Sequence, residues 1–62
     1  MLVKVIHVCS ICDHPMEETI EPYNELVFKD LCQTEPENFM LDIGPGYEGT
    51  CFVYDKECTQ CR

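Results

Sequence analysis

The chain has 62 residues, six of them cysteine, and a formal net charge of −8 from twelve acidic and four basic residues. A chain of this length buries only about 60% of its unfolded surface, so we expect one domain over residues 1–62 without a deep substrate pocket. The basic residues are scattered singly, which excludes the basic stripe that nucleic-acid binding requires.

The cysteine content, close to 10%, predicts a domain held by disulfides or metal. The N-terminal run MLVKVIHV is too short for a signal peptide and lacks a cleavage site. No segment approaches the roughly 20 apolar residues that span a bilayer. We therefore expect a cytoplasmic, reducing location, where paired cysteines are metal ligands. A secreted disulfide domain is the alternative, because an even cysteine count fits it equally well.

Residues 2–8 are the first expected element. Their β-branched and apolar side chains, interspersed with Lys4 and His7, predict a strand that leads directly into Cys9. His7 lies near the end of this strand, and we expect it to be partly buried and hydrogen-bonded.

The middle of the chain allows two interpretations. Residues 19–21 and 26–29 have strand character and flank a turn at 22–25, which favours a hairpin. The apolar residues between 23 and 31 also have near-helical spacing. We prefer the hairpin.

Residues 34–37 have the form of a capping box, with Thr34 followed three residues later by Glu37. Pro36 in the first turn strengthens the pattern. It predicts a short helix over 35–42 that Gly44 ends. The Gly-Pro-Gly sequence at 44–46 predicts a turn.

Residues 50–54 predict the last strand, which leads toward a second Cys-x-x-Cys unit. Each clear strand therefore delivers the chain to a cysteine pair. Two such units facing each other provide the tetrahedral sulfur shell that suits one Zn²⁺ ion, with iron as the alternative. The predicted metal ligands are Cys9, Cys12, Cys58 and Cys61.

Other ligand sets remain open, because residues 13–57 separate the two units and this gap exceeds the commonest spacing. One alternative joins Cys9 and Cys12 to Cys32 and either His14 or Cys51. Two metal ions are a further alternative. We favour buried, apolar roles for Cys32 and Cys51. We expect His14 to be an exposed residue in a turn.

The two strand-then-Cys-x-x-Cys segments resemble the zinc-ribbon and rubredoxin-like fold group. The resemblance covers the two ends of the chain and implies two facing zinc knuckles on a small antiparallel sheet. Knuckles of this group often carry glycine after the second cysteine, where this chain has Asp13 and Arg62. Aspartate tolerates the left-handed conformation better than arginine. The expected fold is therefore a small metal-stabilised α+β domain with antiparallel β hairpins, two zinc knuckles and at most one short helix.

The functional expectation is a non-enzymatic zinc-binding module that acts through protein–protein interaction, as a regulatory or inhibitory accessory protein. The acidic charge favours a larger partner with a basic surface and disfavours nucleic acid and membranes. The candidate contact surface comprises Glu35, Glu37, Phe39, Met40, Tyr47 and Glu48. A rubredoxin-like iron electron-transfer protein is the alternative. A catalytic zinc is disfavoured, because four thiolates close the coordination shell.

Overall fold

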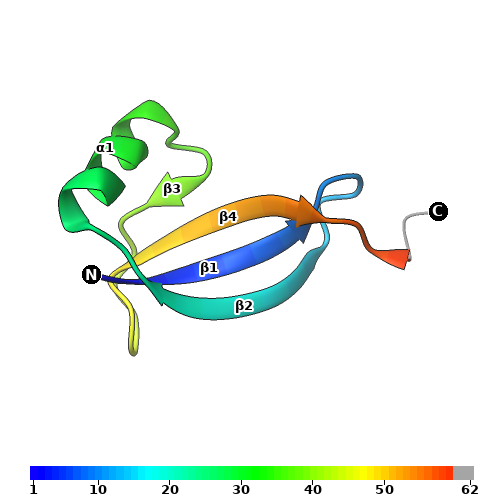
Figure 1. Ribbon diagram of the computed structural model, residues 1–62, viewed down its shortest axis with the longest axis horizontal. Coiled ribbons are helices and arrows are strands. Elements are labelled where there is room, and N and C mark those ends of the chain that lie inside the picture. The colour runs from blue at the N-terminus through cyan, green and yellow to red at the C-terminus, as the bar shows by residue number, and fades with distance from the viewer. Residues whose placement is uncertain (60–62) are drawn as a thin grey trace.

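A four-stranded mixed sheet with one short helix at one end forms the fold (Figure 1). This computed structural model describes residues 1–59. The strand order in the sheet is β2-β1-β4-β3, with β1 antiparallel to β2 and parallel to β4. The elements in chain order are β1 (Leu2–Cys9), β2 (Pro15–Pro22), α1 (Glu25–Thr34), β3 (Phe39–Met40) and β4 (Gly49–Lys56).

The strands predicted at 2–8 and 50–54 are confirmed as β1 and β4. Val3 and Val5 of β1 are buried, and Cys51 lies opposite Val5 on β4. Side chains two apart on a strand point to the same face of the sheet. The two strands therefore present one shared apolar face, on which the core is built.

The core is small and lies at the end of the sheet nearest to α1. It consists of Val3, Val5, Cys51 and Phe28, the last of which α1 supplies. The Phe28 ring packs edge-on against Tyr23 and Phe39, with ring centroids 5.7 and 5.9 Å away. Such edge-to-face contacts are favourable beyond the area they bury. Val8, Cys9 and Cys58 are also buried, at the far end of the sheet.

The hairpin predicted from residues 19–21 and 26–29 is wrong. β2 ends at Pro22, and residues 26–29 belong to α1, the helical alternative. The Asn24 side chain caps the helix by accepting hydrogen bonds from the backbone N–H groups of Leu26 and Val27, at 3.0 and 3.2 Å. This cap satisfies two of the helix's unpaired donors. Phe28 then anchors the helix in the core.

The helix predicted over 35–42 is also wrong. Thr34 is the last residue of α1, so it cannot cap a new helix. A turn at 36–38 leads instead to β3, where Phe39 lies opposite Cys51 of β4. The packing of Phe39 against Phe28 outweighs the local capping pattern. The turn predicted at 44–46 is confirmed, with Gly46 at φ 84°.

The expectation of antiparallel hairpins is only partly met, because β1 and β4 run parallel. The carboxyl ends of both strands therefore lie at the same end of the sheet, away from α1 (Figure 1). That end carries the turn after β1 and the segment after β4. None of the helices in residues 1–59 has the length and apolar character needed to cross a bilayer.

Candidate metal centre

Three of the four predicted ligands come together at the carboxyl ends of β1 and β4. The sulfur atoms of Cys9, Cys12 and Cys58 all lie within 4.8 Å of one another. The Cys12 and Cys58 sulfurs are 3.3 Å apart. Zn–S bonds of about 2.3 Å place the sulfurs of a tetrahedral site about 3.8 Å apart. The cysteine group is therefore close enough to hold a metal ion.

A tight turn positions the first two cysteines. The N–H of Ile11 donates to the Cys9 sulfur at 3.4 Å, and the N–H of Asp13 donates to the Cys9 carbonyl at 3.1 Å. Asp13 has φ 60°, the only positive value outside glycine among the described residues. Aspartate thus adopts the left-handed conformation for which knuckles often use glycine, as its tolerance of that region allows.

A second set of backbone bonds brings Cys58 to this turn. The N–H of Ser10 donates to the Lys56 carbonyl at 2.8 Å, which joins the turn to the end of β4. The N–H of Cys58 donates to the Cys9 sulfur at 3.4 Å. Cys9 therefore accepts two backbone hydrogen bonds at its sulfur, the atom that would bind a metal ion.

Cys61 lies outside the described residues. Its role as the fourth ligand stays a prediction, as does a second zinc knuckle around it. The described residues contain one cysteine turn, and Cys58 lies next to that turn.

The alternative ligand set with Cys32 is not brought together by residues 1–59. Cys51 is fully buried in the core, where the Tyr23 hydroxyl lies 3.8 Å from its sulfur. Burial raises the pKa of the Cys51 thiol, which disfavours the thiolate that a metal needs. Cys32 packs against the same core from α1. The apolar role expected for both cysteines agrees with these positions.

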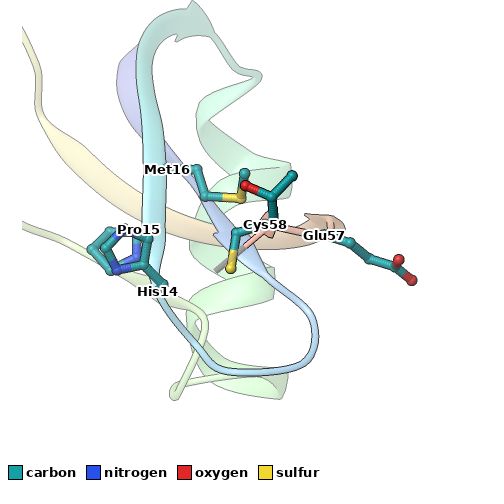
Figure 2. A pocket seen from close by; sticks show the side chains of 6 residues that line it. His14, Pro15, Met16, Glu57 and Cys58 are labelled. Carbon is teal, nitrogen blue, oxygen red and sulfur yellow. The ribbon is translucent and has the colours of Figure 1, made fainter. Parts of the chain in front are cut away.

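His14 is exposed, as expected, and does not join the converging sulfurs in the described part of the chain. It lines an open hollow of about 310 Å³ beside the cluster, together with Met16 and Cys58. Figure 2 shows His14, Pro15 and Met16 along one segment and Glu57 and Cys58 on another. The hollow brings solvent to one side of the cysteine group.

His7 is partly buried and hydrogen-bonded, as expected, and its partner is Asp55. Its Nδ1 lies 3.1 Å from an Asp55 carboxylate oxygen, between the parallel strands β1 and β4. The hydrogen bond from His7 lowers the pKa of Asp55 below its ordinary value. Lys56 forms a further ion pair with Glu17 of β2 at 3.1 Å. These contacts join three strands just before the cysteine group.

The backbone donors at Ile11 and Cys58 are the part of the site that sequence reasoning missed. No residue type encodes them, because any residue other than proline supplies an N–H group.

Comparison with known proteins adds no further assignment: no protein-family model, curated protein or solved structure matches the chain.

Proposed function

We propose that this protein is a small zinc-binding module without catalytic activity, which acts by contacting a larger protein. The observation that carries the proposal is the convergence of the Cys9, Cys12 and Cys58 sulfurs at one end of the sheet. With Cys61 as the fourth ligand, the shell would be closed. A closed sulfur shell serves structure rather than catalysis.

The proposed metal role follows from where the small core lies. The core residues cluster near α1, whereas the cysteine group is at the carboxyl ends of β1 and β4. Zinc bound there supplies a cross-link between those ends, and metal affinity of this kind contributes directly to folding. Thiolate ligands suit zinc, and they also accept iron in a similar geometry. Metal analysis therefore distinguishes the scaffold from an electron-transfer protein.

The proposed contact surface is the segment 40–48, which we call the contact loop. Within it, Leu41 and Ile43 are 59% and 85% exposed, and Asp42 and Glu48 of the same loop are acidic. Solvent exposure of large apolar side chains is typical of surfaces that bind other proteins. The contact loop includes Met40, Tyr47 and Glu48, which also belong to the contact surface expected from the sequence. In the rest of that surface, Glu35 and Glu37 are exposed, and Phe39 is partly buried against the core. The net charge of −8 favours a partner with a basic surface.

Metal content is the first test. Protein purified natively under reducing conditions is expected to be colourless and to carry one zinc per chain by elemental analysis. Red protein that carries one iron per chain and has a reversible one-electron couple would support the electron-transfer function instead of the scaffold function. Absence of any bound metal, together with retained folding after chelation, would refute both functions.

Partner binding is the second test. The zinc-loaded protein and a Leu41→Ser, Ile43→Ser variant are used as baits, and captured proteins are identified by mass spectrometry. We expect a reproducible basic partner that the variant loses. Ile20→Thr, which changes an exposed apolar residue of β2, is the matched control and should keep the partner. Equal capture by both variants would exclude the contact loop as the binding surface.

A further inference from the structure

We propose that Cys12 and Cys58 form an oxidation site, where a peroxide converts the two thiolates to a disulfide with release of zinc. The inference rests on the proposed zinc function and adds a chemical modification to the same site. Its basis is the 3.3 Å separation of the two sulfur atoms. A disulfide bond of about 2.05 Å needs the sulfurs to approach by little more than 1 Å.

The three clustered cysteines differ in their access to an oxidant. Cys12 is exposed, at the tip of the turn that follows β1. Cys9 is fully buried, and its sulfur accepts the backbone hydrogen bonds from Ile11 and Cys58. Oxidation of cysteine follows thiolate character and exposure. Cys12 is therefore the thiolate that meets a peroxide first.

Cys58 is placed to complete the bond. Cys58 is only 8% exposed, yet its sulfur is 3.3 Å from that of Cys12 and it lines the open hollow. A buried second thiolate beside an exposed first one is the arrangement of a resolving cysteine. Cys9, in contrast to Cys58, does not line that hollow.

The chemistry balances with hydrogen peroxide as the only oxidant. The Cys12 thiolate attacks one peroxide oxygen, the O–O bond breaks, and the departing hydroxide takes a proton to become water. The resulting sulfenic acid is attacked at sulfur by the Cys58 thiolate, and the S–O bond breaks to release a second water after protonation. Two sulfurs lose two electrons in total, and the two peroxide oxygens gain them.

The disulfide would connect the same two chain segments that zinc connects. A backbone hydrogen bond from the Ser10 N–H to the Lys56 carbonyl already joins these two segments. Oxidised sulfurs no longer bind the metal as thiolates, so zinc release accompanies the bond. The β1–β4 end of the sheet consequently stays joined in the oxidised form, whereas chelation of the reduced form leaves it without a cross-link.

The test treats the zinc-loaded full chain with hydrogen peroxide and follows zinc release with a chromophoric indicator. We expect about one equivalent of zinc, a mass loss of 2 Da and reversal by dithiothreitol with added zinc. Trypsin places Cys9 and Cys12 in one peptide and Cys58 and Cys61 in another, because it cleaves after lysine. Fragmentation between the paired cysteines of each peptide then identifies the bonded sulfurs.

Three outcomes separate this inference from the proposed function. A bond between Cys12 and Cys58 with zinc release supports it. Zinc-loaded protein that forms another cysteine pair, or only sulfinic acid, overturns the inference and leaves the zinc module intact. A Cys12–Cys58 bond in protein that never binds zinc overturns the zinc module and with it the coupled release. Cys32→Ser is the matched control and should release zinc at the wild-type rate, whereas Cys12→Ser should not form the bond.

Discussion

Cys9 of β1 lies opposite Lys56 of β4 at the end of the parallel strand pair. Cys58 follows Lys56 by two residues, and its N–H reaches the Cys9 sulfur. Parallel pairing thus places cysteines that are far apart in sequence at one end of the sheet. In the expected zinc ribbon, facing knuckles on antiparallel hairpins serve the same purpose. Here the register of β1 and β4 brings the sulfurs together.

Loss of a single ligand should remove tight zinc binding. We expect Cys9→Ser to lower zinc affinity by more than the 10- to 100-fold that loss of an outer hydrogen-bonding partner causes. Cys9 carries two backbone hydrogen bonds as well as its proposed metal bond. Competition with a chromophoric chelator measures the affinity, and circular dichroism reports the accompanying loss of sheet.

Cys32→Ser is the matched control, because Cys32 lies on α1 away from the converging sulfurs. It should retain one zinc and wild-type affinity. Cys61→Ser tests the fourth ligand predicted from sequence. Unchanged zinc affinity in Cys9→Ser would contradict the proposed metal site.

Asp13, the residue that follows Cys12, gives a second prediction. Asp13 has φ 60°, a conformation that costs a β-branched residue roughly 1–2 kcal/mol. Asp13→Val should therefore destabilise the zinc-loaded protein by about that amount, whereas Asp13→Gly should stay within about 0.5 kcal/mol of wild type. Urea unfolding monitored by circular dichroism measures both. Equal stabilities for the valine and glycine variants would contradict the left-handed turn.

Parts of the fold were predictable because they depend on local chemistry. The β-branched runs of β1 and β4 and the Gly-Pro-Gly turn carry their own signals. The cysteine spacing likewise identified three residues that the structure brings together. His7 and Cys51 also occupy the kinds of environment expected for them.

The errors arose where tertiary contacts decide between two local patterns. Phe28 packs into the core from α1, and Thr34 falls at the end of that helix instead of starting another. The parallel direction of β1 and β4 is not recorded in either strand's sequence, because both directions use the same alternation. The mixed sheet therefore could not be read from the residues, although its two central strands could.

A close contact in the core gives a third prediction. A Cβ atom at Gly49 would lie 2.6 Å from Cε1 of the Phe28 ring, so Gly49→Ala forces the ring or β4 to move. We expect a loss of about 1–3 kcal/mol, the usual cost of overpacking. Urea unfolding of the zinc-loaded protein measures it.

A double-mutant cycle makes the cause specific. Phe28→Leu shortens the side chain that Gly49 contacts, so the double variant should be more stable than the sum of the single losses predicts, by about 0.5 kcal/mol or more. Gly46→Ala is the control, because φ is 84° there and no atom lies within 4 Å of the added carbon. Its cost should add to that of Phe28→Leu. Additivity at Gly49 would rule out the clash.

The helix cap gives a fourth prediction. Asn24→Ala removes the acceptor of two backbone N–H groups and should destabilise the protein by about 1 kcal/mol. Asn24→Asp keeps an acceptor oxygen at the same position and should restore most of the stability. Thermal unfolding of the zinc-loaded variants measures the difference. Equal melting temperatures for the alanine and aspartate variants would show that the cap contributes nothing to folding.

The pair formed by Tyr23 and Cys51 predicts a loss of stability in alkaline solution. Burial raises the pKa of the Tyr23 hydroxyl from 10.0 to about 12, and it also raises the pKa of the Cys51 thiol above 9.0. Both groups hold their protons more tightly in the folded chain than in the unfolded chain. Their stabilising contribution is therefore complete below pH 9 and declines as the pH rises toward 12.

Tyr23→Phe isolates the tyrosine part of this effect. Between pH 10 and 12 the unfolded wild type releases the Tyr23 proton and the folded wild type retains it, so its free energy of unfolding falls more steeply than that of the variant. Urea midpoints of zinc-loaded protein at pH 8, 10 and 11 measure the two slopes. Tyr54→Phe, which removes a hydroxyl from an exposed side chain, is the matched control. Parallel slopes for wild type and Tyr23→Phe would mean that the Tyr23 hydroxyl titrates alike in the folded and unfolded chains, so its contact with Cys51 would not bear on alkaline stability.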